Sequence, residues 1–89
     1  MDDVKDNPAR SRYELTVDGY TAFVEYRLHP GVIEYYHTEV PKELGGRGVG
    51  SKLAAGVLAA ARARGLKVKA TCPFIAAYIK KNPDSADLV

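Results

Sequence analysis

Residues 37–52 constrain the fold of this chain most strongly, because a run typical of a β-strand passes there through a cluster of glycines into the start of a helix. Glycines let the backbone approach a phosphate closely, and the N-terminus of a helix carries partial positive charge. The sequence therefore predicts an anion-binding turn for a phosphorylated ligand. Its contacts would come from the backbone N–H groups of residues 46–51, the hydroxyl of Ser51 and the guanidinium of Arg47.

The composition is that of one folded domain. Of the 89 residues, 46% are hydrophobic and 27% are charged, which suits a single core and leaves no room for a second domain. Residues 1–11 are polar and contain the Asn7-Pro8 break, so we expect a flexible lead-in followed by one domain over residues 12–89. Thirteen basic and eleven acidic side chains give a net charge of +2, which is too balanced for nucleic acid to be the main partner.

The cysteine content and the apolar runs bear on location. Cys72 is the only cysteine and cannot form an intramolecular disulfide, and the first residues lack the apolar run of a signal peptide. No apolar run reaches the roughly 18 residues that a membrane span requires. We therefore expect a cytoplasmic protein that does not insert into membranes, and we predict no metal site.

The first half of the chain reads as three antiparallel strands. Hydrophobic and polar residues alternate in residues 13–17 and 20–26, and Asp18-Gly19 between them is a two-residue hairpin signal. A turn at His29-Pro30-Gly31 follows. Residues 32–40 are then rich in β-branched and aromatic side chains, which predicts the third strand.

The second half reads as helix, strand and helix. From Gly48 the apolar spacing is that of one helical face, and Gly65 is placed to end that helix. Residues 66–70 alternate as a fourth strand, and residues 74–81 form a short helix before Pro83. The predicted order is β-β-β-α-β-α, an α/β (α+β) fold whose mixed, mostly antiparallel sheet contains one parallel crossover.

Two common phosphate-binding patterns do not fit the turn. A P-loop has Lys and then Ser or Thr directly after its last glycine, whereas here Gly50 is followed by Ser51 and only then by Lys52. A dinucleotide fold has an acidic residue about 20 positions after its glycines, but residues 67–70 are Lys-Val-Lys-Ala.

The turn resembles instead the acetyl-CoA-binding motif of the GNAT superfamily of N-acetyltransferases. Gly48-Val49-Gly50 matches the Gly-x-Gly core, while Gly45 stands where the family usually has Gln or Arg. Over residues 12–84 the chain is similar to a small truncated branch, the YjdJ-type predicted acetyltransferases. That likeness rests on the run His37-Thr-Glu-Val-Pro, the glycines and Cys72-Pro73-Phe74. The sequence departs from that branch at Asn82-Pro83-Asp84-Ser85.

The resemblance implies a minimal GNAT-like fold, acetyl-CoA as cofactor and acetyl transfer to an amine such as an exposed lysine or a protein terminus. The CoA pyrophosphate would be held by residues 45–51, which are Gly45, Gly46, Arg47, Gly48, Val49, Gly50 and Ser51. The pantetheine would pair with the backbone from Thr38 to Val40. Lys80 and Lys81 could meet the terminal phosphates, or could form a solvated helix face.

Four side chains are candidates for chemistry. His37 and Glu39 are two apart on a strand, so they share a face and could relay a proton from the amine, or could be solvated. The resemblance places Cys72 where the third and fourth strands splay apart around the thioester, where His37 could activate it as a nucleophile, unless it is a buried small hydrophobe. Tyr78 aligns with a tyrosine that protonates the CoA sulfur in many GNAT enzymes, and could equally be a core residue.

Direct attack by the acceptor amine is the expected route, and transfer through an acetyl-Cys72 intermediate is the minority one. A non-catalytic acyl-CoA-binding or protein-interaction module is the main alternative, because the helices that build the acceptor site in full GNAT domains have no room between residues 27 and 32. A small nucleic-acid-binding fold is a second and weaker alternative. The acceptor and the oligomeric state are left open by the sequence.

Overall fold

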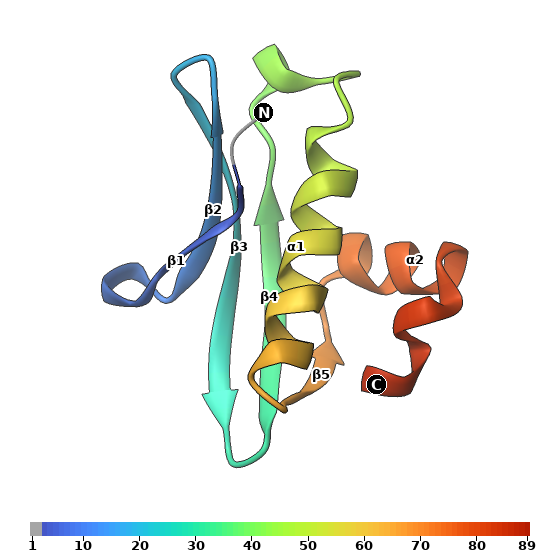
Figure 1. Cartoon of the computed structure of the whole chain (residues 1–89). Helices are drawn as coiled ribbons and strands as arrows, with labels where there is room; N and C mark the ends of the chain where they lie inside the picture. Colours follow the sequence, from blue (N-terminus) through green and yellow to red (C-terminus); the bar gives the residue numbers. More distant parts are fainter. Residues whose placement is uncertain (1–2) are drawn as a thin grey trace.

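Within residues 3–89, the part of the chain that the computed structural model describes, five strands form one sheet and two α-helices pack against it (Figure 1). The strands lie in the sheet in chain order: β1 (Lys5–Asn7), β2 (Arg12–Val17), β3 (Tyr20–His29), β4 (Val32–Glu39) and β5 (Lys67–Ala70). The helices are α1 (Val49–Ala63) and α2 (Pro73–Lys81), with short 3₁₀ helices η1 (Pro8–Arg10), η2 (Lys42–Leu44) and η3 (Pro83–Leu88). Neighbouring strands from β1 to β4 pair antiparallel, and β4 pairs parallel with β5. The predicted mixed α+β fold with one parallel crossover is confirmed.

Alternation along the strands decides which face of the sheet is buried. Leu15, Val24 and Tyr35 are fully buried and lie on one face, called here the inner face. Helix α1 packs against this face, where the hydroxyl of Tyr35 donates a 2.6 Å hydrogen bond to the carbonyl oxygen of Val57. No helix of residues 3–89 covers the opposite, outer face (Figure 1).

The hairpin between β2 and β3 forms as the sequence predicts. Val17 pairs with Tyr20, so Asp18 and Gly19 are the whole loop. Both have positive φ angles, 51° and 81°, which is the geometry of a type I′ turn. The tip of this hairpin is thereby fixed at the end of the sheet where β4 also finishes (Figure 1).

Strand β4 contains a bulge. Glu25 of β3 pairs with His37 whereas Tyr26 pairs with Tyr35, so Tyr36 is an extra residue on β4. The extra residue reverses the alternation beyond it. Thr38 therefore joins Val24 on the inner face, and His37 joins Glu25 on the outer face.

Helix α1 ends where the sequence predicts. Gly65 has a φ of 68°, its N–H donates to the carbonyl of Arg62, and the N–H of Leu66 donates to the carbonyl of Ala61. This pair of bonds is the Schellman motif, which satisfies the last carbonyls of a helix. Neither α1 nor any other helix within residues 3–89 is both long enough and apolar enough to span a membrane.

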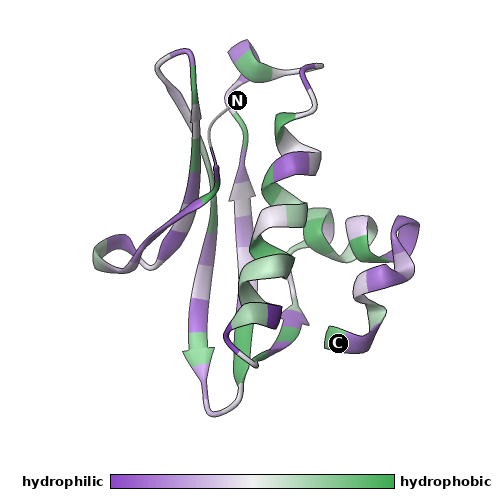
Figure 2. Ribbon diagram, in the orientation of Figure 1, coloured by the Kyte–Doolittle hydropathy of each residue, from purple (hydrophilic) through white to green (hydrophobic). Residues whose placement is uncertain are grey.

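The N-terminal segment differs from the expectation. We expected residues 1–11 to lie outside the folded elements, but β1 pairs with β2 and η1 follows it. The Asp6 carboxylate also accepts a 2.7 Å hydrogen bond from the Tyr26 hydroxyl, and Val4 lies against Gly56 of α1. Figure 2 shows β1 as hydrophilic along its length, so it lacks the alternating pattern from which a strand is predicted. Residues 1 and 2 lie outside the described residues.

Candidate functional site

The glycine turn (residues 45–51) leads from η2 into α1. Gly46 and Gly48 both have a φ of 74°, a conformation that favours glycine. Gly48 is the N-cap residue of α1, and no side chain caps the helix there. The first intrahelical bond runs from the N–H of Lys52 to the carbonyl of Gly48, so the N–H groups of Val49, Gly50 and Ser51 precede it. These N–H groups are the type of donor that binds anions at helix N-termini.

The glycines of the turn serve different purposes. A Cβ atom at Gly46 or Gly48 would meet no heavy atom within 4 Å, so the surface there is open to a ligand. A Cβ atom at Gly50 would lie 3.0 Å from Cζ of Phe74, so this glycine allows α2 to pack closely on the start of α1. Gly45 donates its N–H to the carbonyl of Lys42 at 3.0 Å and thus closes η2, which leaves that N–H engaged.

A cavity of about 200 Å³ lies between the first turn of α1 and α2. It is lined by Ser51, Phe74, Ala77, Tyr78 and Lys81. The fold thus brings together Ser51 and Tyr78, which are far apart in the sequence and were both predicted to be in the site. Lys81 adds a positive charge on the same wall.

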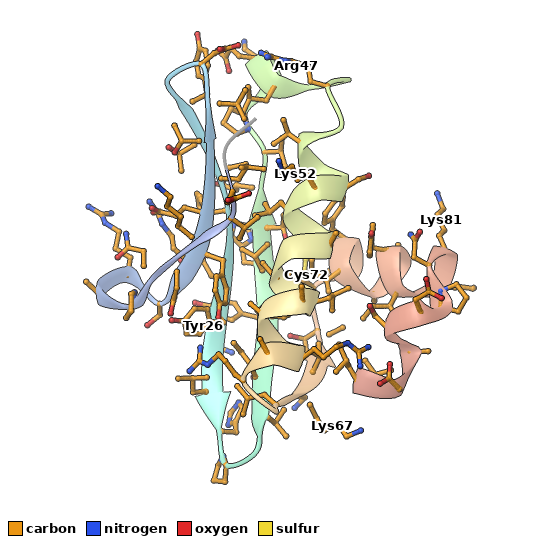
Figure 3. All side chains as sticks on the ribbon, viewed as in Figure 1. Tyr26, Arg47, Lys52, Lys67, Cys72 and Lys81 are labelled. Carbon is orange, nitrogen blue, oxygen red and sulfur yellow. The ribbon has the colours of Figure 1, made fainter. Side chains whose placement is uncertain are left out.

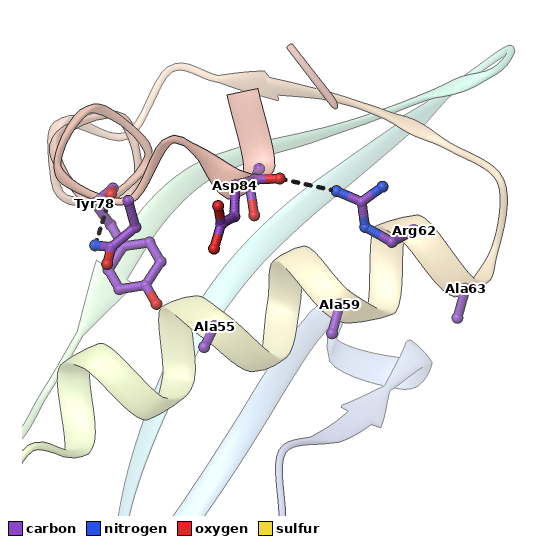
Figure 4. Close-up of a pocket in the computed structure, with 8 residues that line it drawn as sticks. Ala55, Ala59, Arg62, Ala63, Tyr78 and Asp84 are labelled. Carbon is purple, nitrogen blue, oxygen red and sulfur yellow. Dashed lines mark hydrogen bonds between the residues drawn. The ribbon is translucent and has the colours of Figure 1, made fainter. Parts of the chain in front are cut away.

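A larger hollow of about 440 Å³ continues along α1 (Figure 4). Small side chains, Ala55, Ala59 and Ala63, form one wall, and Tyr78 lines this hollow as well as the smaller cavity. At its far end Arg62 makes two hydrogen bonds to the Asp87 carboxylate, at 2.8 and 2.9 Å. This hollow could not be predicted from the sequence, because it depends on how η3 folds back over α1.

Beyond Tyr35, strand β4 continues without β5 at its side. The parallel pairing ends at Tyr35 and Ala70, and the N–H of Cys72 then donates to the carbonyl of Tyr35 at 3.0 Å. Residues 37–39 pair with β3 only, and Tyr36 is the unpaired bulge residue. β5 therefore ends beside Tyr35, and Thr38 lies on the stretch of β4 that has no strand along this edge. A divergence of the two strands around a thioester stays a prediction.

Cys72 and His37 lie on opposite faces of the sheet. Cys72 is 4% exposed, and its Sγ atom lies 3.2 Å from Oγ1 of Thr38 on the inner face. His37 is on the outer face, where its Nε2 atom lies 3.7 Å from Oε1 of Glu39 and its ring centroid lies 6.2 Å from that of Phe23. The expectation that His37 lies beside Cys72 is therefore wrong, and the bulge at Tyr36 is the reason.

Glu34 is a residue that sequence reasoning missed. Its carboxylate, on the outer face, is nearly buried and accepts hydrogen bonds from His29 Nε2 at 3.0 Å and from Thr71 Oγ1 at 2.9 Å. The bonds from His29 and then Thr71 hold the pKa of this carboxyl below its usual range. Glu34 thus holds Thr71, which lies between the end of β5 and Cys72. The only signal in the sequence is a lone acidic residue within an apolar strand.

Arg47 is the one cation inside the glycine turn. Its Nη1 atom lies 2.7 Å from Oδ2 of Asp18, the first residue of the β2–β3 hairpin loop. Both side chains are exposed, at 45% and 67%. The guanidinium that was predicted to meet a phosphate is therefore paired with a carboxylate of the protein itself.

Comparisons with known proteins agree with this geometry. A model of the GCN5-related N-acetyl-transferase family matches residues 12–88. The NMR solution structure of a Staphylococcus aureus protein described as a GCN5-like N-acetyltransferase matches with a TM-score of 0.74 at 31% identity, covering 97% of this chain and 85% of that chain. Proteins named NATD1 from Gallus gallus and Mus musculus are each 38% identical over 52 residues, which is 58% of this chain and 47% of theirs.

This chain spans about half the length of the curated relatives it matches. The matches leave the YjdJ-type branch a prediction. The match to the family model extends over nearly the whole fold described above, from β2 to η3, and includes the glycine turn. The chain belongs to the GCN5-related N-acetyltransferase family.

Proposed function

We propose that the chain transfers an acetyl group from acetyl-CoA to an amine, with an exposed lysine or a protein terminus as the candidate acceptor. One observation carries the proposal: the uncapped start of α1 lies on the same segment as the stretch of β4 that has no β5 beside it, with only the short helix η2 between them. An anion site and an open strand edge therefore lie on one segment of the chain, residues 37–51. A cytoplasmic location is part of the proposal, since Cys72 is a free thiol.

The chain's own residues have distinct parts in this proposal. N–H groups of residues 46–51 bind the pyrophosphate, with Ser51 adding a hydroxyl and Lys81 a charge. The backbone from Thr38 to Val40 pairs with the pantetheine arm. Acetyl-CoA, when bound, supplies an acetyl group activated as a thioester.

Proton transfer falls to side chains on the two faces of the sheet. His37 is 47% exposed on the uncovered outer face, from which an amine can approach, and it accepts the proton of the incoming ammonium. Glu39 stabilises the imidazolium from 3.7 Å. Tyr78, which lines the cavity on the helix side, donates a proton to the leaving thiolate. The outer face thus serves the acceptor and the inner face the acyl donor.

Replacing Gly48 tests the cofactor site. Gly48→Ala puts a side chain at a φ of 74° on the open side of the turn, and we expect calorimetry to show CoA binding weakened by about tenfold, the loss of one or two phosphate hydrogen bonds. Gly65→Ala is the matched control. It has a φ of 68° at the other end of α1 and equally open surroundings, so it carries the same backbone strain but should bind CoA normally.

Assays of the wild-type protein distinguish the two candidate functions, the transferase and the non-catalytic acyl-CoA-binding module. Release of free CoA thiol in the presence of a panel of amines and lysine peptides would support the transferase. Tight CoA binding with no release for any acceptor would support the non-catalytic acyl-CoA-binding module instead. Failure of the wild-type protein to bind CoA or acetyl-CoA would contradict both.

A further inference from the structure

The tip of the β2–β3 hairpin contacts the glycine turn through an ion pair, in which Asp18 Oδ2 lies 2.7 Å from Arg47 Nη1. Figure 3 shows Arg47 at the end of the molecule to which the hairpin tip also reaches. Both backbones are fixed locally: Asp18 by its place in the type I′ turn, and Arg47 by the left-handed glycines on either side of it. The ion pair therefore joins two rigid turns that are far apart in the sequence.

The carboxylate of Asp18 is dispensable for the turn in which it sits. The first position of a type I′ turn is occupied by Asn as readily as by Asp, because each tolerates a positive φ. Asn would keep the hairpin and remove the negative charge. The charge of Asp18 therefore acts on Arg47 and not on the fold.

The ion pair is of a kind that a ligand can replace. Both partners are exposed, and exposed pairs between flexible side chains are weak. A guanidinium binds phosphate oxygens through paired, charge-assisted hydrogen bonds, and Arg47 sits one residue before the N-cap of α1, where phosphate binding is proposed. Asp18 and a bound phosphate would thus compete for the same cation.

We propose that Asp18 is a built-in competitor for Arg47, and that a phosphorylated ligand entering the glycine turn displaces the Asp18 carboxylate from the guanidinium. This inference rests on the proposed function, because it takes the CoA pyrophosphate as the ligand. The hairpin tip then sets the affinity for CoA, and it changes its contacts whenever the site fills.

Calorimetry on the full chain tests this, with CoA and inorganic pyrophosphate as probes. Asp18→Asn should tighten CoA binding by about two- to fivefold, the range expected when one exposed ion pair no longer competes. In an Arg47→Gln background the same substitution should change the affinity very little. Glu43→Gln is the control, since Glu43 is an exposed acid four residues from Arg47 that makes no ion pair within residues 3–89.

The outcomes separate the inference from the proposed function. If Asp18→Asn and Glu43→Gln increase the affinity for CoA equally, the effect is one of general charge. If Asp18→Asn weakens CoA binding, Asp18 orients Arg47 for the ligand. Either result overturns the inference. If the wild-type protein binds CoA and Asp18→Asn has no effect, only this inference fails. If pyrophosphate binds more tightly to Asp18→Asn while CoA does not bind the protein at all, the competition between Asp18 and a phosphate stands, but CoA is not the ligand and the proposed function fails.

Discussion

Cys72 lies at the point where β5 leaves the sheet, yet its sulfur is enclosed. Its side chain is 4% exposed, its Sγ atom contacts the Thr38 hydroxyl, and its N–H is bonded to Tyr35. A thiol needs a base or a cation to become a nucleophile, and the histidine expected to provide it lies on the other face of the sheet. At the scale of single residues, the structure favours direct attack by the amine over transfer through Cys72.

We therefore predict that Cys72→Ala retains at least about half of the wild-type turnover, with a loss of about 1 kcal/mol in the free energy of unfolding from the smaller buried side chain. Release of CoA thiol and urea denaturation measure the two effects. Cys72→Ser keeps the size of the group and serves as the comparison. Loss of turnover in the alanine variant with CoA binding intact, together with a burst of CoA release from the wild-type protein without acceptor, would establish the acetyl-cysteine route instead.

At the scale of elements, β4 shows what a sequence pattern can and cannot predict. The strand itself, the helix after the glycines and the end of that helix at Gly65 all follow from local composition and are confirmed. The faces on which the side chains of β4 lie cannot be predicted from local composition. Alternation counted from Ile33 and Tyr35 would put His37 on the inner face. The bulge at Tyr36 reverses this count, and it arises from pairing with β3, which no local pattern encodes.

The bulge predicts opposite behaviour for two neighbouring residues of β4. Thr38→Ala removes a part-buried side chain that contacts Cys72, and we expect it to lower the free energy of unfolding by about 1 kcal/mol. His37→Ala, on the exposed face, should change stability by less than about 0.5 kcal/mol but should lower the rate of acetyl transfer. A regular strand would give the reverse order of stabilities in urea denaturation, which would refute the placement of these residues.

At the scale of the whole molecule, the segment before β2 was the least predictable part. β1 is three polar residues, and its position depends on contacts with two distant elements: Asp6 with Tyr26 of β3, and Val4 with Gly56 of α1. The candidate site, too, could be predicted from the sequence only in part. The glycine turn could be predicted from its residues, whereas the pairing of Arg47 with Asp18 and the cavity shared by Ser51 and Tyr78 exist only after the chain has folded.

A cluster of tyrosines ties the N-terminal strand to the rest of the fold. The ring of Tyr26 lies 5.3 Å from that of Tyr13, and the Tyr13 hydroxyl accepts a 3.1 Å hydrogen bond from Arg64 at the end of α1. Burial, followed by the hydrogen bond to Asp6, raises the pKa of Tyr26 to about 12. The neutral phenol is thus favoured in the folded protein relative to the unfolded chain, where the value is 10.0.

This shift predicts how stability changes in alkali. Because the folded pKa is the higher one, the contribution of Tyr26 is complete below about pH 10 and is lost as the pH rises through about 12. Tyr26→Phe cannot ionise. At pH 7 it should be less stable than the wild-type protein by about 1 kcal/mol, since Asp6 loses its partner. The difference should shrink and then reverse as the pH rises from 10 to 12, because a shift of about two pKa units is worth more than about 1 kcal/mol. Thermal unfolding across this range measures the difference, with the exposed Tyr20→Phe as control. If the stabilities of the wild-type protein and Tyr26→Phe change in parallel with pH, the contacts of Tyr26 with Asp6 and the core do not favour its neutral phenol.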